Sequence, residues 1–253
     1  MVGGALRVVP TALPLPIFEL EASLVLVPPP PSGRLRAMNP CFARAATVAL
    51  LLVPFACTTS TLRPTPGALG FDEPLAGWNA ASTGGRGPAS SWLVHADPAA
   101  ISPPNVLSLS AQNHASEDRF NLYWTAGTRF SDGTLSVAVR ANGGDIDQGG
   151  GPVWRVQDAN NYYVCRVNPL ESNYRVYVVK DGVRRQLGNA PIETRVGEWV
   201  RLDVEHRGDR IVCSLDGRKL LDVTDATIAE GGGVGVWTKA DARTSFDDLS
   251  IAP

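Results

Sequence analysis

The chain has 253 residues, which is enough for one large domain or two small ones. Its 23 basic and 25 acidic residues leave a net charge of −2, which argues against nucleic-acid binding because that function usually needs a clustered basic surface. The 25 glycines and 20 prolines favour turns over helices.

Segment 38–57 has the pattern of an export signal. It begins with Met, carries a positive charge at Arg44, and continues with an apolar run over 45–56 that is too short to span a bilayer. The run ends in VPFAC, which resembles a bacterial lipobox except that Pro54 stands where Leu is usual. The pattern predicts lipidation of Cys57, with ordinary signal-peptidase cleavage or a buried helix as the alternatives.

Residues 1–37 precede this signal and contain four consecutive prolines at 28–31 without any sustained periodicity. Because a signal peptide works from the N-terminus, we interpret them as a gene-model extension before a start at Met38; a disordered extension is the alternative. Residues 58–70, rich in Pro and Thr, are expected to form a tether. The signal predicts an exported lipoprotein, periplasmic or on the cell surface, that meets the membrane only through its lipid.

Residues 71–253 are expected to form the folded domain. Three stretches, 132–142, 198–209 and 209–217, alternate apolar and polar residues with a period of two, which predicts half-buried antiparallel strands. The side chains assigned to the core are Leu135, Val137, Val139, Val200, Leu202, Val204, Ile211, Cys213 and Leu215.

Turn-forming residues separate these runs. Asp-Gly pairs at 181–182 and 216–217 predict tight hairpins, and Gly208 predicts a third turn. One helical turn is expected near 226–230. About a dozen strands with such spacing indicate a β-sandwich or a closed barrel.

Three longer segments, 161–187, 198–225 and 231–251, resemble a known family. They contain, in order, NYYVCRVNPLESNYRVYVVKDG, EWVRLDVEHRGDRIVCSLDG and GGGVGVWTKADARTSFDDLSI, as in bacterial concanavalin A-like (laminin-G-like) jelly-roll domains close to DUF1080 or 3-keto-disaccharide hydrolase-like proteins. The resemblance implies an all-β fold of two antiparallel sheets, one of them concave and often used for sugars. It does not specify an activity, because this fold includes lectins, glycosidases and adhesion modules.

The resemblance also implies a structural Ca²⁺, for which Asp247 and Asp72 would be ligands; surface acids without a metal are the alternative.

Phe246, Leu249 and Ile251 cannot all face inward on a regular strand. A β-bulge near 247–248 is therefore predicted.

A ligand site is expected on the face opposite the core. Val234 and Val236 are assigned to the core, so Trp237 should lie on the other face, although the alternative is that Trp237 is itself a core residue. An aromatic ring flanked by charged and amide groups suits a sugar. The candidate ligand-binding residues are Trp154, Arg166, Asn168, Glu171, Asn173, Trp237, Lys239 and Asp241.

The sequence gives only weak evidence for a catalytic pair of carboxylates. Asp203 and Glu205 stand two apart on one strand, roughly 7 Å from each other, which is a glycosidase-like separation. Glycosidases of this fold, however, carry Glu-x-Asp-x-x-Glu, and position 208 here is Gly. Arg201 on the same face favours a solvated strand face, so no catalytic residue is assigned.

The remaining reactive side chains have no catalytic spacing either. His95, His114 and His206 lack the spacing of a metal site and are expected at the surface or in turns. Cys165 and Cys213 are expected to be buried free thiols more often than a disulfide, because mid-strand pairs seldom have bridging geometry.

Three functions fit these observations. The first is an exported carbohydrate-binding jelly-roll module without catalysis. The alternatives are a glycoside or 3-keto-disaccharide hydrolase-like enzyme and a protein-interaction or adhesion module. Apart from the Ca²⁺, no cofactor is expected, and neither is nucleic acid.

Overall fold

Fourteen β-strands make up the fold in a computed structural model that describes residues 62, 68–72, 75–109 and 115–253. The predictions for residues 1–57 lie outside these residues, as does His114. The strands are β1 Trp78–Thr83, β2 Trp92–Ala96, β3 Asn105–Leu109, β4 Phe120–Phe130, β5 Gly133–Gly143, β6 Gly151–Asp158, β7 Asn161–Asn168, β8 Asn173–Lys180, β9 Val183–Pro191, β10 Trp199–Arg207, β11 Arg210–Leu215, β12 Arg218–Thr224, β13 Gly232–Lys239 and β14 Arg243–Ala252.

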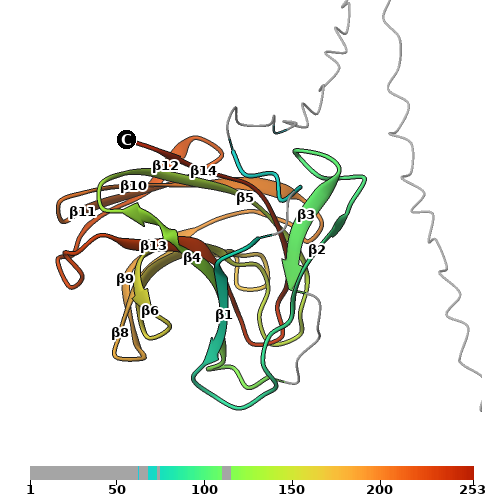
Figure 1. Ribbon diagram of the computed structural model, residues 1–253, viewed down its shortest axis with the longest axis horizontal. Helices are drawn as coiled ribbons and strands as arrows, with labels where there is room; N and C mark the ends of the chain where they lie inside the picture. Colours follow the sequence, from blue (N-terminus) through green and yellow to red (C-terminus); the bar gives the residue numbers. More distant parts are fainter. Residues whose placement is uncertain (1–61, 63–67, 73–74, 110–114) are drawn as a thin grey trace, which may run out of the picture. The chain divides into compact units, whose positions relative to one another are not determined.

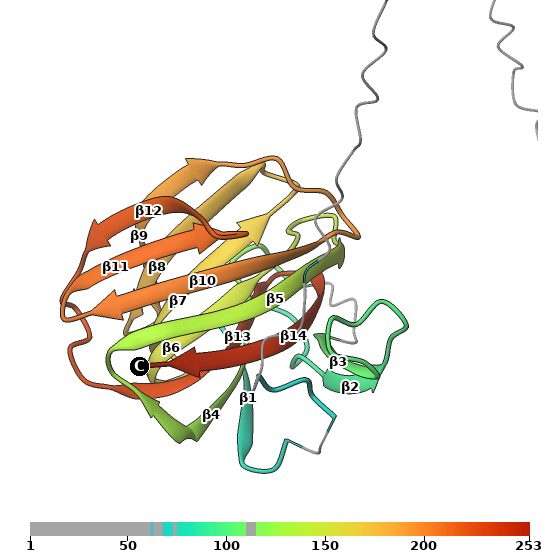
Figure 2. The ribbon, with the colours of Figure 1, turned by 90° about the horizontal axis from the view of Figure 1, so that it is seen from above.

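These strands form two antiparallel seven-stranded sheets that pack face to face (Figure 1). The first sheet has the order β1-β4-β13-β6-β7-β8-β9. The second has the order β12-β11-β10-β5-β14-β3-β2, which can be followed across its face in Figure 2. The predicted all-β, two-sheet jelly-roll sandwich is confirmed.

The predicted hairpins are present. Asp181 and Asp216 adopt φ angles of 51° and 49°, and each is followed by a glycine with positive φ. Gly208, with φ of 62°, forms the β10–β11 turn. These left-handed conformations suit Asp-Gly and glycine, which explains why local sequence was sufficient to place the turns.

The helical turn expected near 226–230 is absent, and that prediction was wrong. Contacts with side chains hold this segment in place instead. The Asp225 carboxylate accepts from the Thr227 N–H at 3.0 Å, and the Tyr163 hydroxyl accepts from the Ile228 N–H at 3.1 Å. Tyr163 lies on β7, far away in sequence, so local propensity could not reveal this.

The main core lies between the sheets. All nine side chains assigned to it from the sequence belong to it, together with Val234 and Val236. His206 is buried as well, although it was expected at the surface, because it continues the inward parity of Leu202 and Val204 on β10. Cys165 and Cys213 are buried in this core as free thiols, as predicted.

The last strand contains the predicted bulge. The pairing of β14 with β5 shifts register between Asp247 and Ser250, and Asp248 has a φ of 53°. The shift lets both Phe246 and Leu249 reach the core, while Ile251 stays 42% exposed. The parity conflict in the sequence thus located the irregularity correctly.

The first sheet is strongly curled. Phe120 on β4 and Arg184 on β9 are five strands apart in the sheet order, which on a flat sheet would separate them by about 24 Å. The Arg184 guanidinium nevertheless lies 5.1 Å from the centre of the Phe120 ring. The face of this sheet that is turned away from the second sheet is therefore concave, and we call it the concave face.

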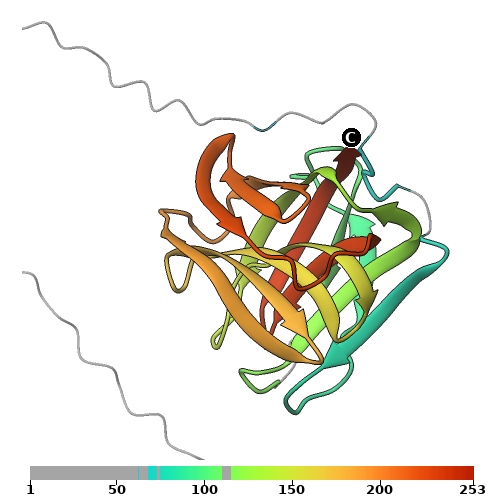
Figure 3. The ribbon, with the colours of Figure 1, turned by 90° about the vertical axis from the view of Figure 1, so that its left-hand side faces the viewer.

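The two sheets also meet along one edge. The β8–β9 hairpin and the β11–β12 hairpin lie on the same side of the sandwich, as Figure 3 shows (orange and darker orange). Contacts such as the Arg185–Asp225 ion pair at 2.6 Å join this edge.

Candidate ligand-binding site

An aromatic floor covers part of the concave face. Its main rings are Phe120 on β4, Tyr162 on β7, Tyr177 on β8 and Trp237 on β13. The Trp237 Nε1 donates to the Tyr162 hydroxyl at 3.2 Å, and the Trp237 ring packs against Phe120 with centroids 5.5 Å apart. Burial raises the pKa of Tyr162, so its hydroxyl stays neutral and serves as an acceptor here.

Arg184 lies across this floor. Its guanidinium carbon is 4.5 Å from the centre of the Tyr177 ring and 5.9 Å from that of Trp237, in addition to the contact with Phe120. Such distances are typical of cation–π contacts. The Arg184 Nη1 is buried and has no hydrogen-bond partner.

A cluster of charged and amide side chains adjoins the floor. Arg166 on β7 donates to Asn173 and to Glu171, at 2.9 Å in each case. Arg175 contacts the same Glu171 oxygen at 3.0 Å. Although burial opposes the charged form, hydrogen bonds from Asn173 and Arg166 lower the pKa of Glu171 to about 2.

Asp147 joins this cluster to β13. Its Oδ1 accepts from Asn168 at 3.2 Å, and its Oδ2 lies 3.1 Å from the Lys239 ammonium. Both charged side chains are almost fully buried. Burial raises the pKa of Asp147 and outweighs the opposing charges of Arg166 and Lys239.

Six of the eight predicted ligand residues meet on this face: Arg166, Asn168, Glu171, Asn173, Trp237 and Lys239. The seventh, Asp241, accepts the backbone N–H groups of residues 145–147 at 2.7 to 3.0 Å, so it holds the loop that carries Asp147. Trp154 lies apart from them, in the core, where its Nε1 donates to His206 at 2.8 Å. We therefore leave Trp154 out of the site.

Trp237 has no exposed surface. A sugar could stack on its ring only if Arg184 moved. What is accessible is a shallow cavity of about 610 Å³ beside it, lined by Ser116, Glu117, Asp118, Phe120, Arg184 and Lys239. Sequence reasoning did not assign Asp147 or Arg184. The first lies in a glycine-rich loop without periodicity, and the second is one of two consecutive arginines on an edge strand.

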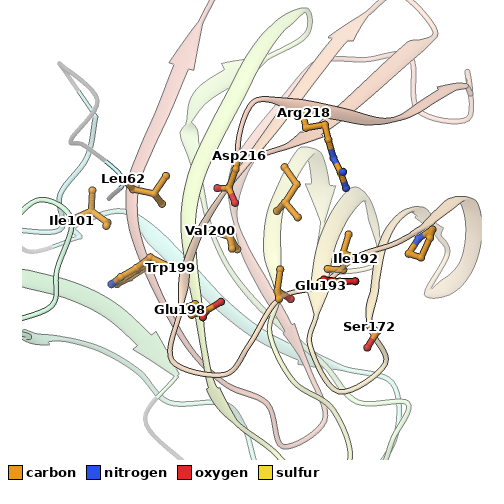
Figure 4. A pocket seen from close by; sticks show the side chains of 13 residues that line it. Leu62, Ile101, Ser172, Ile192, Glu193, Glu198, Trp199, Val200, Asp216 and Arg218 are labelled. Carbon is orange, nitrogen blue, oxygen red and sulfur yellow. The ribbon is translucent and has the colours of Figure 1, made fainter. Parts of the chain in front are cut away.

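A larger cavity of about 1190 Å³ lies elsewhere, where the β7–β8, β9–β10 and β11–β12 connections meet (Figure 4). Apolar side chains such as Ile192 and Val200 form its walls, and Glu193 and Asp216 stand among them. Its Trp199 donates to the Ala99 carbonyl at 2.6 Å. Loops distant in sequence build this cavity, so no local motif predicted it.

The two residues predicted to bind Ca²⁺ have different surroundings. Asp247 is fully buried, and its carboxylate accepts the N–H groups of Ile101, Ser102 and Asp248 at 2.7 to 2.8 Å. Asp72 accepts from the Asn105 amide at 3.2 Å. Among the described residues, no group of three or more His, Cys, Asp or Glu side chains is arranged to hold a metal ion. Calcium binding stays a prediction.

Asp203 and Glu205 lie on the outer side of the second sheet, away from the concave face. Asp203 accepts from Ser136 at 2.6 Å, and the exposed Glu205 pairs with Arg207 at 3.0 Å. Both carboxylates thus have structural partners on a solvated strand face.

Within the described part of the chain, no helix is long and apolar enough to cross a membrane.

One family model matches the sequence, and known structures are similar to the fold. The model of a family described as 3-keto-alpha-glucoside-1,2-lyase-like domain matches residues 70–252. The carbohydrate-binding module CBM66 of Bacillus subtilis superimposes with a TM-score of 0.54 at 18% identity, covering 70% of this chain and 96% of that one. A Bacillus subtilis protein with a galectin-like fold gives a TM-score of 0.46 at 9% identity, covering 69% of this chain and 88% of its own. None of the curated proteins matches the sequence.

Proposed function

Because the chain belongs to the 3-keto-alpha-glucoside-1,2-lyase-like domain family, we propose that it is an exported carbohydrate-binding jelly-roll module that acts without catalysis. The strongest support comes from unpaired polar atoms on the concave face. There, two buried guanidinium atoms, Arg166 Nε and Arg184 Nη1, have no hydrogen-bond partner beside an aromatic floor. Buried polar atoms are almost always paired, so two orphans at one site indicate a missing partner.

A sugar supplies what this site lacks. Its hydroxyls can accept from guanidinium groups, and its C–H faces can stack on aromatic rings, which is the usual combination in ligand sites. The cavity beside Phe120 and Lys239 is also lined by Arg184, so a ligand there would contact one ring of the floor and one of the two guanidinium groups. The similarity in fold to a carbohydrate-binding module supports the same ligand class.

Titration calorimetry with a panel of neutral and acidic oligosaccharides tests this function. We expect binding by the wild type and a loss of at least tenfold in affinity for Lys239→Gln, because the ammonium lies in the wall of the cavity. Trp199→Ala, in the larger cavity, is the matched control and should bind normally. Loss of binding in Trp199→Ala but not in Lys239→Gln would move the ligand to that second cavity.

An enzyme is the second candidate, which one observation favours. Asp147, whose pKa is raised by burial, stands 3.1 Å from Lys239, and a carboxylate–ammonium pair of this kind can transfer protons in a lyase or hydrolase. Incubation with 3-keto-glucosides and the parent glycosides, followed by product analysis, separates the two functions. Turnover that Asp147→Asn abolishes while sugar binding persists would overturn the non-catalytic proposal.

Export through a lipid anchor at Cys57 is part of the proposal. Detergent-phase partitioning of the native protein, followed by mass spectrometry, should find an acyl group on Cys57. A Cys57→Ser variant should stay in the aqueous phase. An unmodified wild-type protein in that phase would contradict the anchor but not the sugar site.

A further inference from the structure

We infer that the concave-face site takes an acidic sugar, a uronic acid, whose carboxylate binds Arg184. This inference rests on the proposed carbohydrate-binding function and adds the chemical class of the ligand. It comes from the difference between Arg184 and the other cations of the sheet.

Two consecutive arginines on the edge strand β9 point to opposite faces, as the period of a strand requires. Arg185 points toward the second sheet, where it pairs with Asp225 at 2.6 Å and donates to Thr227 at 2.9 Å. Arg184 lies on the concave face, on the rings of Phe120 and Tyr177. Arg184 and Arg185 thus have the same charge and lie on the same strand, but they have different partners.

The other buried cations of the concave face are neutralised by carboxylates. Arg166 pairs with Glu171 at 2.9 Å, and Lys239 pairs with Asp147 at 3.1 Å. Among the residues that the structure describes, no carboxylate pairs with Arg184, and its Nη1 is both buried and without an acceptor. A buried donor on a charged group is costly to leave unpaired, so an anionic ligand group gains more here than a hydroxyl.

Two acids also line the cavity and would repel an anion, but only weakly. The Glu117 side chain is 78% exposed and lies 3.4 Å from Lys239, and Asp118 accepts from Ser116 at 2.7 Å. Charges in contact with water are well screened. Arg184, with its aromatic contacts on one side and a buried N–H, is in a less polar setting, where attraction to a carboxylate is stronger.

A carboxylate on a sugar ring fits this arrangement better than an isolated anion. The planar guanidinium can donate two parallel N–H bonds to a planar carboxylate. The ring attached to that carboxylate would then occupy the cavity between Arg184, Phe120 and Lys239. Because Nη1 is buried, the side chain must turn for this atom to meet the carboxylate.

The experiment compares pairs of oligosaccharides that differ only in the carboxylate, such as galacturonate and galactose trimers and glucuronate and glucose trimers. Calorimetry is done with the full chain as wild type, Arg184→Gln and Arg185→Gln. We expect the wild type to bind one acidic trimer at least tenfold more tightly than its neutral counterpart. Arg184→Gln should reduce this ratio to near one, while Arg185→Gln keeps it. Circular dichroism confirms that each variant folds.

The outcomes separate this inference from the proposed function. Binding of neutral trimers without preference for their acidic counterparts overturns the inference but leaves carbohydrate binding intact. Equal loss of the preference in both arginine variants also overturns it, because the effect would then be one of net charge. Tighter binding of a sulfated trimer than of any uronate overturns the assignment of a carboxylate. No binding of any sugar overturns both proposals.

Discussion

We expect His206 to make the folded state sensitive to mild acid. It lies fully buried on β10, where its Nδ1 accepts from the Trp154 Nε1, so the proton of the neutral ring must be on Nε2. Burial, assisted by the nearby Arg155 charge, lowers its pKa to about 4 from an ordinary value of 6.5. The unfolded chain therefore binds a proton below pH 6.5 that the folded chain accepts only near pH 4.

The sign and size of the effect follow from linkage. Stability falls as the pH decreases wherever the unfolded state binds more protons, and one pKa unit corresponds to about 1.36 kcal/mol. At pH 5, the pH lies about 1.5 units below the ordinary pKa of histidine, 6.5. His206 should therefore cost about 2 kcal/mol of stability between pH 7 and pH 5.

Urea unfolding at pH 7 and pH 5, followed by tryptophan fluorescence, measures this loss in the wild type and in His206→Gln. Glutamine keeps an acceptor for Trp154 and does not titrate, so the variant should lose about 2 kcal/mol less than the wild type. His95→Gln, outside the core, is the control for a change from histidine to glutamine. Burial raises the pKa of Asp247 to about 6, which stabilises the fold as the pH falls, but this contribution is common to all three proteins. Equal losses in wild type and His206→Gln would refute the reasoning.

Three further predictions concern the fold. Phe246→Ala, in the core, should lower the free energy of unfolding by about 3–5 kcal/mol, whereas Ile251→Ala on the same strand, 42% exposed, should cost much less; similar urea midpoints for the two would contradict this. Cys165 and Cys213 should react with a thiol reagent only in denaturant, and fast reaction of either in the folded protein would show that it is accessible. Asp247→Asn should cost about 1–3 kcal/mol, because an amide cannot accept all three N–H bonds. If the calcium prediction holds, a chelator lowers the Tm of the wild type but not of this variant, and the same shift in both would count against the metal.

The sequence predicted those parts of the fold in which one strand face is solvated. On β10, buried and less buried residues alternate, so the period-two pattern was readable and gave the core side correctly. Asp-Gly turns and the bulge at Asp247 were also readable, because each depends on local conformation or on a break in parity.

The candidate site was predictable only in part, because the curl of the sheet is a long-range property. Parity assigned Arg166 and Lys239 to the face opposite the core, and both lie there. It could not show that they would be buried, since burial comes from strands several positions away. Asp147 and Arg184 were missed for the same reason: a loop and an edge strand bring them to the site without any local pattern.

The curled sheet also affects how this protein can change in evolution. Every residue of β7 and β13 after the first is buried. Side chains on one face of each strand pack in the core, and those on the other face pack on the concave face. A substitution that retunes the ligand face of these strands therefore disturbs a packed cluster as well. Selection for a new sugar can act more freely on the rim, at the β9 edge and the 116–118 loop, where side chains can vary without loosening either cluster.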